Sequence, residues 1–362
     1  MHGSLALKIE PHAESATSGG PESSSKPEIS LDSVRPRPYR WILHPVADLL
    51  LSCGGLVWIL FAFHWCIAAP TKNVLLLQTL AIVSILGTHG FGETHIAATL
   101  MKVFGSLSTR QKFHRQTTVW VAIFACLGLA GLFIPGVTPW MTRAYLILVA
   151  QHFTAQTYGL ALLYCYKNQY TLDNVDKTVI RWLLNFTALY AVARQLTFKE
   201  WNANGFLAQQ VPWFTLPGWI FNIIAVALVA TGLLSIILIV KRAVTAGQLM
   251  PLPAILTIFT GIAMFVATRD QVGILFLYLP AFYHGSQYVV LTLATHLKEK
   301  GLPDGIPTTE IYRACSSPAA LKYLGMLLLM ACAIYIGLPR MLEEIGFAYT
   351  LSFATVFLVF NL

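Results

Sequence analysis

Long apolar stretches, separated by short polar or basic segments, recur along the chain from about residue 43 onward. Each stretch is close to twenty residues long, which is enough to cross a hydrocarbon core of about 30 Å as a helix. The apolar residues follow one another without alternation, and a backbone in lipid must satisfy its own hydrogen bonds, so the pattern predicts helices. The predicted fold class is all-α, a polytopic helical membrane bundle of about ten transmembrane helices.

The predicted spans are read directly from these stretches. They cover residues 43–66, 74–100, 117–135, 143–166, 180–197, 217–240, 252–268, 272–296, 319–338 and 344–362. Residues 1–34 are rich in Ser, Pro, Gly and Glu and have few large apolar side chains, which predicts a disordered N-terminal tail. Residues 35–362 then form one transmembrane helical domain.

The low fraction of charged residues supports a membrane protein, and in a membrane protein the positive net charge has a different interpretation. Only 11% of the residues are charged, against roughly 25% in soluble domains. The net charge of +8 does not require nucleic acid, because basic residues of membrane proteins collect in cytoplasmic loops. With the N-terminus inside, sixteen of the 24 Lys and Arg residues fall on the cytoplasmic side and six on the other. We therefore expect an integral protein of a bacterial inner membrane with a cytoplasmic N-terminus.

Three of the predicted spans carry a histidine that is followed one helical turn later by a polar side chain. These sets are His89 with Glu93, His152 with Gln156, and His284 with Gln287 and Tyr288. Spacings of three and four residues place side chains on one face of a helix. Because ionisable groups are costly inside a membrane, they predict a functional site there.

The three histidines also agree in depth. They lie 13 to 15 residues before Lys102, Lys167 and Lys298 respectively, which is roughly 20 Å at 1.5 Å per residue. We therefore expect the imidazoles of His89, His152 and His284 to converge near the middle of the bilayer, pointing into the bundle.

A second group of polar residues lies nearer the cytoplasmic side. His95 follows His89 by six residues, which turns it off the His89 face. His44 and Asp48 enter from the cytoplasmic end of the first span and are positioned to meet His95. The whole set forms either one elongated site or two sites.

These residue types favour a metal. Imidazoles with a carboxylate suit Fe, Zn or Cu, and two or three His with one carboxylate and open positions suit non-haem iron and oxygen chemistry. The candidate metal ligands are His89, His95, His152, His284, His44 and Asp48. Glu93 and Tyr288 are the catalytic candidates, while Gln156 and Gln287 would orient the bound group by holding the imidazoles.

A metal at this depth implies a lipophilic substrate, such as a carotenoid, a quinone or a fatty chain, that arrives laterally from the lipid bilayer. The predicted function is a membrane-embedded, metal-dependent oxidoreductase or oxygenase.

Other functions remain open at this point. His152 and His284 could be the axial ligands of a haem, although the paired histidines usual in multi-haem bundles are absent. A proton-coupled transporter would also use His and Glu, but the chain has no clear inverted repeat. A non-catalytic membrane component, with or without a pigment, would use the same residues for packing.

Two short segments resemble a known family. "HGFGE", which begins at His89, and "FYHGSQY", which contains His284, are similar to motifs of the Brp/Blh family of bacterial membrane carotene dioxygenases. The resemblance implies a polytopic fold with intramembrane histidines, bound iron and cleavage of β-carotene to retinal. It also implies His89, His152 and His284 as ligands, with His44 or His95 as a fourth. The chain has more predicted spans than that family.

Overall fold

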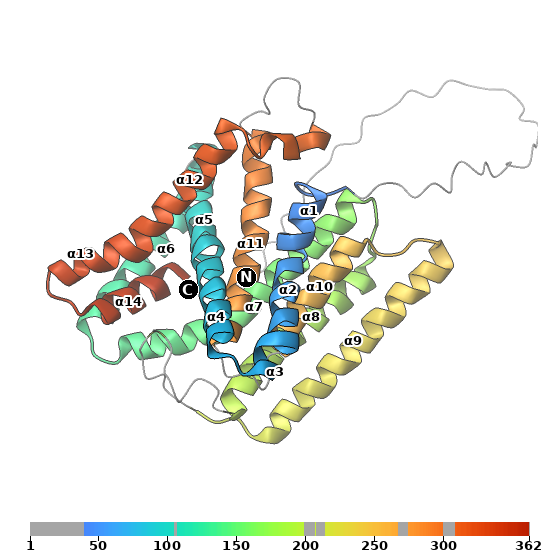
Figure 1. The fold of residues 1–362 in the computed structure, drawn as a ribbon, viewed down its shortest axis with the longest axis horizontal. Coiled ribbons are helices and arrows are strands. Elements are labelled where there is room, and N and C mark those ends of the chain that lie inside the picture. Colours follow the sequence, from blue (N-terminus) through green and yellow to red (C-terminus); the bar gives the residue numbers. More distant parts are fainter. Residues whose placement is uncertain are drawn as a thin grey trace, which may run out of the picture. The chain divides into compact units, whose positions relative to one another are not determined.

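The computed structural model describes residues 40–104, 107–198, 207, 214–266, 274–299 and 308–361. Every element within this described part is helical (Figure 1), in agreement with the predicted all-α class. The predicted disordered tail, residues 1–34, lies outside the described residues.

The first half of the described chain contains one broken helix and four longer helical segments. Its elements are α1 (Pro45–Ala47), η2 (Asp48–Ser52), α2 (Gly55–Phe63), η3 (His64–Ala68), α3 (Ala69–Thr71), α4 (Val74–Gly87), η4 (Thr88–Glu93), α5 (Thr94–Phe104), α6 (Leu107–Phe133), α7 (Val137–Lys167) and α8 (Asn174–Phe198).

The second half adds the outer helix, a central helix and a C-terminal group. Its elements are α9 (Gly218–Ala246), α10 (Leu252–Val266), α11 (Ile274–Glu299), η5 (Thr308–Ala314), α12 (Pro318–Cys332), η6 (Ala333–Gly337), α13 (Leu338–Glu344) and α14 (Tyr349–Asn361).

Several of these helices are compatible with an integral membrane protein. Five segments of the described chain are long and apolar enough to cross a membrane: Val74–Phe104, His114–Phe133, Val137–Lys167, Gly218–Thr245 and Pro318–Glu344. The bent pair Pro45–Ser52 and Gly55–Ala68 would make a sixth, while α10 and α14 are apolar but shorter. Each of the ten predicted stretches contains helix, but the count of ten spans remains a prediction because length and composition support five or six.

The central helix α11 organises the bundle. It packs against α4, η4 and α5, and also contacts η2, α7, α10 and α12. Helix α7 packs against α8 and α10, and α9 lies along α8 at the edge of the ribbon drawing (Figure 1). Helix α11 therefore contacts both α5 and α7, which come from distant parts of the sequence.

Four π-helical turns interrupt the described helices, namely η2, η3, η4 and η6. A π-helical turn is rare, and it holds more residues than an α-helical turn, so it shifts the faces that later residues present. The turn η4 lies in the middle of Val74–Phe104 and has the sequence THGFGE. The faces of α5 therefore do not follow the spacing of an uninterrupted α-helix.

Candidate metal centre

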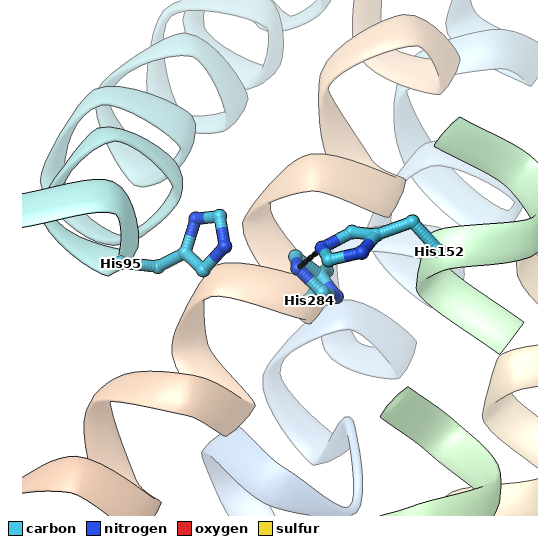
Figure 2. Close-up of side chains that lie close together, drawn as sticks. All are labelled: His95, His152 and His284. Atoms are coloured by element: carbon cyan, nitrogen blue, oxygen red, sulfur yellow. Dashed lines mark hydrogen bonds between the residues drawn. The ribbon is translucent and has the colours of Figure 1, made fainter. Parts of the chain in front are cut away.

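Three histidines from three helices lie close together. His95 comes from α5, His152 from α7 and His284 from α11, and Figure 2 shows the His95 ring directed at the other two. One candidate ligand nitrogen from each residue lies within 4.8 Å of the others. The ring centroids are 4.7 Å apart for His152 and His284 and 4.8 Å apart for His95 and His284. We call these three residues the histidine triad.

The spacing of two triad nitrogens fits a shared ion. The Nε2 atoms of His152 and His284 are 3.1 Å apart, as the dashed line in Figure 2 marks. Two nitrogens that each lie about 2.1 Å from one ion are roughly 3.0 to 3.4 Å apart. The widest spacing in the triad, 4.8 Å, is larger, so one imidazole must turn inward to complete a set of three.

The backbone fixes the orientation of His95. Its Nδ1–H donates to the carbonyl of Gly92 at 2.9 Å, which leaves Nε2 with its lone pair. Metal-binding histidines are typically held in this way by their second nitrogen. The ring of Tyr288 stands perpendicular to the His95 ring, with centroids 5.1 Å apart, and its hydroxyl accepts a hydrogen bond from Thr99 at 3.1 Å.

Close backbone packing brings His95 to α11. A Cβ atom at Gly285 would lie 2.4 Å from the carbonyl carbon of Phe91 and 2.5 Å from the nitrogen of Gly92. Only glycine allows so close an approach, because any other residue would have to displace backbone atoms. Thr88, at the start of η4, donates to the carbonyl of Tyr278 at 2.9 Å and ties the other end of the turn to α11.

The two residues after Gly285 bind the bend of the first helix. The helix bends by 55° between its two halves, and Gly54 takes the left-handed conformation at the bend with φ of +82°. The bend removes intrahelical partners from nearby carbonyls. Ser286 donates to the carbonyl of Leu51, and Gln287 donates to the carbonyl of Ser52, each at 3.0 Å. The stretch His284–Gln287 thus contacts both η4 and η2.

A pair of glutamines joins the two helices that carry His152 and His284. Gln156 Nε2 donates to the carbonyl of His284 at 2.8 Å and lies 3.1 Å from Oε1 of Gln287, to which it also donates. Gln156 and Gln287 were predicted to orient imidazoles. The structure instead has them bind backbone carbonyls and each other, so they hold α7 against α11.

The triad is closed on two sides and open on one. His284 is 2% exposed and His95 is 7% exposed, whereas His152 is exposed. The ring of Phe153 stacks on His284 with centroids 4.3 Å apart. A cavity of about 10 Å³ borders His284 and Gln287, which is room for about one water molecule. A small molecule would therefore reach the triad from the side on which His152 is exposed.

His89 lies outside the triad, contrary to the predicted convergence of His89 with His152 and His284. Its Nδ1 pairs with Glu93 on the same helix, and the two side chains are 45% and 10% exposed. His95 takes the place expected for His89. Equal numbers of residues from a basic landmark give equal depths only in straight helices of equal tilt. The π-helical turn and the close packing at Gly285 break that condition.

His44 and Asp48 are not part of the triad either. His44 caps α1 by accepting a hydrogen bond from the Val46 N–H at 3.2 Å. The Asp48 side chain accepts from the N–H groups of Ile42 and Leu43 at 2.6 and 3.1 Å. It also accepts from the Tyr164 hydroxyl at 3.0 Å. Both residues have structural partners at the start of the first helix.

Gly285, Ser286 and Thr99 support the site but were not among the predicted site residues. The signal for Gly285 was present, because the glycine directly follows His284 in a helix where glycine is unfavourable. The role of Thr99 had no signal, because a threonine in an apolar helix usually bonds to a carbonyl of its own helix, and Thr99 also makes that bond, to the carbonyl of His95 at 3.1 Å.

The chain is therefore a helical bundle with a cluster of three histidines. Several of its helices are apolar and long enough to be compatible with a membrane. Comparison of the chain with protein-family models, with curated proteins and with solved structures finds no match. The resemblance to the Brp/Blh family stays a prediction from the two short motifs.

Proposed function

We propose that the chain is a membrane-embedded, metal-dependent oxidoreductase that acts on a lipophilic substrate. The proposed ligands are His95, His152 and His284, and the proposed metal is iron. The observation that carries the proposal is the meeting of three imidazoles from three helices, two of them with Nε2 atoms 3.1 Å apart. Three histidines that leave an open coordination position are an established arrangement for catalytic divalent metals.

The donor set supports a first-row transition metal. Imidazole nitrogens suit iron, copper and zinc, and a bound ion of this kind would supply an open position for oxygen or substrate. Among the described residues the group contains no Asp or Glu, so Glu93 is not proposed as a ligand. The Gly92 carbonyl orients His95, while the exposed side of His152 provides the route for a substrate from lipid.

The same geometry disfavours a haem held between His152 and His284. Two axial nitrogens on opposite sides of one iron would be about 4 Å apart, at about 2.0 Å each. The Nε2 atoms of His152 and His284 are 3.1 Å apart, and their rings are inclined at 61°.

A transporter is the main alternative, because the first helix is broken and transporters use broken helices to bind ions. Three carbonyls at this break are already satisfied by side chains. Leu51 and Ser52 accept from Ser286 and Gln287, and Cys53 accepts from Thr260 at 2.8 Å. These hydrogen bonds give the three carbonyls at the bend protein partners without an ion, which supports the enzyme over the transporter.

The membrane arrangement is part of the proposal. We propose ten spans in a bacterial inner membrane, with the N-terminus in the cytoplasm, on the evidence of the apolar stretches and the asymmetry of Lys and Arg.

Elemental analysis and an absorption spectrum of the purified full chain test the proposal. The wild-type chain should hold about one metal ion per chain. His284→Ala should hold none, whereas His114→Ala, which changes an exposed histidine on α6, should keep it. A wild-type chain that takes up no Fe²⁺, Cu²⁺ or Zn²⁺ would contradict the proposal, and haem or carotenoid absorption would favour the alternatives.

A further inference from the structure

The pair formed by His89 and Glu93 is a second polar feature with its own surroundings. His89 lies midway along the segment Val74–Phe104, and its side chain is 45% exposed. Leu86, one turn earlier, is 63% exposed, and Ile82, one turn before that, is 55% exposed. Among the described residues, no atom outside the local helix backbone would lie within 4 Å of a Cβ atom at Gly90. Within the described part of the chain, this side of the helix is exposed at Ile82, Leu86 and His89, and the first two are apolar.

An imidazole in that position needs hydrogen-bond partners. Leaving a polar group without one in an apolar environment is costly, and polar residues within membrane helices are accordingly rare. Nδ1 of His89 is satisfied by Glu93, whose side chain is 10% exposed. Within the described part of the chain, Glu93 is the hydrogen-bonding partner of His89. The second nitrogen, Nε2, is left for another molecule.

We propose that Nε2 of His89 binds the hydroxyl group of a lipophilic molecule, a long-chain alcohol or phenol, lying in the bilayer beside η4. A hydroxyl both donates and accepts, so it suits either tautomer that Glu93 imposes on the ring. An alkyl chain offers no partner, and a charged headgroup does not reach the middle of the bilayer. The inference rests on the proposed membrane placement of Val74–Phe104 and needs no metal at the triad.

Photo-crosslinking with two matched probes tests the inference. The purified full chain is placed in phosphatidylcholine vesicles with hexadecanol that carries a diazirine, or with hexadecane that carries the same diazirine. Labelled peptides are then mapped by mass spectrometry. The alcohol should label the residues around His89 at a concentration roughly tenfold lower than the alkane, the size expected for one hydrogen bond.

Variants assign the effect to the ring. His89→Leu should lower labelling by the alcohol to the level of the alkane. His89→Gln retains a donor and an acceptor and should keep most of the difference, as should Leu86→Ala, which changes an exposed apolar neighbour. Equal labelling by the two probes in the wild type would overturn the inference, and so would undiminished labelling of His89→Leu.

The same samples separate this inference from the proposed function. The metal content of His89→Leu should equal that of the wild type, because His89 is not a triad residue. If neither probe labels any residue of 74–104, the segment is not in lipid and both the inference and the membrane placement fail. If labelling follows the expectation while the wild type binds no metal, only the metal proposal fails.

Discussion

His89 and His95 lie on one continuous helical segment, only six residues apart, yet they have opposite surroundings. His95 is 7% exposed, its Nδ1 is held by the Gly92 carbonyl, and its ring faces two further imidazoles. The His89 side chain is 45% exposed and is paired with a carboxylate of its own helix. The first lies on the face that α11 covers, and the second does not.

A local sequence motif does not by itself place a histidine among the candidate ligands that meet at one point. His89 has the better motif, with a carboxylate at a spacing of four residues and glycines on both sides. A metal site needs several ligands from different segments at one point, so it depends on which face the neighbouring helix meets. Here Gly285 determines which face of this helical segment meets α11, because it lets α11 approach the backbone of Phe91 and Gly92.

Replacing His95 or His89 by alanine should produce the largest difference in metal binding between the two positions. His95→Ala should weaken metal binding by more than about 100-fold, beyond the 10- to 100-fold losses usual for residues that only support a ligand. His89→Ala should leave the affinity within about twofold of the wild type, because it deletes no triad nitrogen. Metal titration of the two purified variants measures this, and equal losses would show that both histidines belong to one site.

A methyl group at Gly285 should separate the two helices that make the site. Gly285→Ala should lower the free energy of unfolding by about 1 to 3 kcal/mol, the usual cost of overpacking, and should weaken metal binding with it. Gly159→Ala is the matched control, because no described atom outside the local helix backbone would lie within 4 Å of a Cβ there, and it should change stability by no more than about 1 kcal/mol. Thermal unfolding in detergent compares the two, and equal stability would refute the close-packing argument.

The glutamine contact between α7 and α11 should have a smaller effect. Gln156→Leu removes the hydrogen bonds to His284 and Gln287 and should weaken metal binding by about 10- to 100-fold. It should also shift the visible absorption of the Co²⁺-loaded chain, since the distance between His152 and His284 changes. Gln151→Leu is the control, because Gln151 is exposed and donates to Asn185 instead. A Gln156→Leu spectrum identical to that of the wild type would exclude a positioning role.

The smallest effect on metal binding is expected at Glu93. Glu93→Gln keeps the size of the side chain and should leave metal affinity within about twofold, because Glu93 binds His89 and not a triad residue. It should leave the preferential labelling of the His89 region by hexadecanol largely intact, because an amide can still bond to Nδ1 and a hydroxyl suits either tautomer of the ring. A strong loss of metal in Glu93→Gln would instead restore the carboxylate as a member of the metal site.

Much of the fold was predictable from the sequence alone. Uninterrupted apolar stretches determine that the chain is helical and compatible with a membrane, because a backbone without water must bond to itself. The histidines at 152 and 284, each with a glutamine one turn away, were recognisable because ionisable and amide groups are rare in such stretches. These conclusions depend only on composition and spacing within one segment.

The identity of the third histidine was decided by the tertiary structure. The sequence placed His89 at the common depth, but η4 changes the helical phase after Thr88, and Gly285 selects the face that meets α11. Likewise Asp48, a ligand candidate from spacing, is taken up by the N–H groups of Ile42 and Leu43. Periodicity fixes which residues share a face of one helix. Which faces meet depends on the packing of all the helices together, and that information is not local.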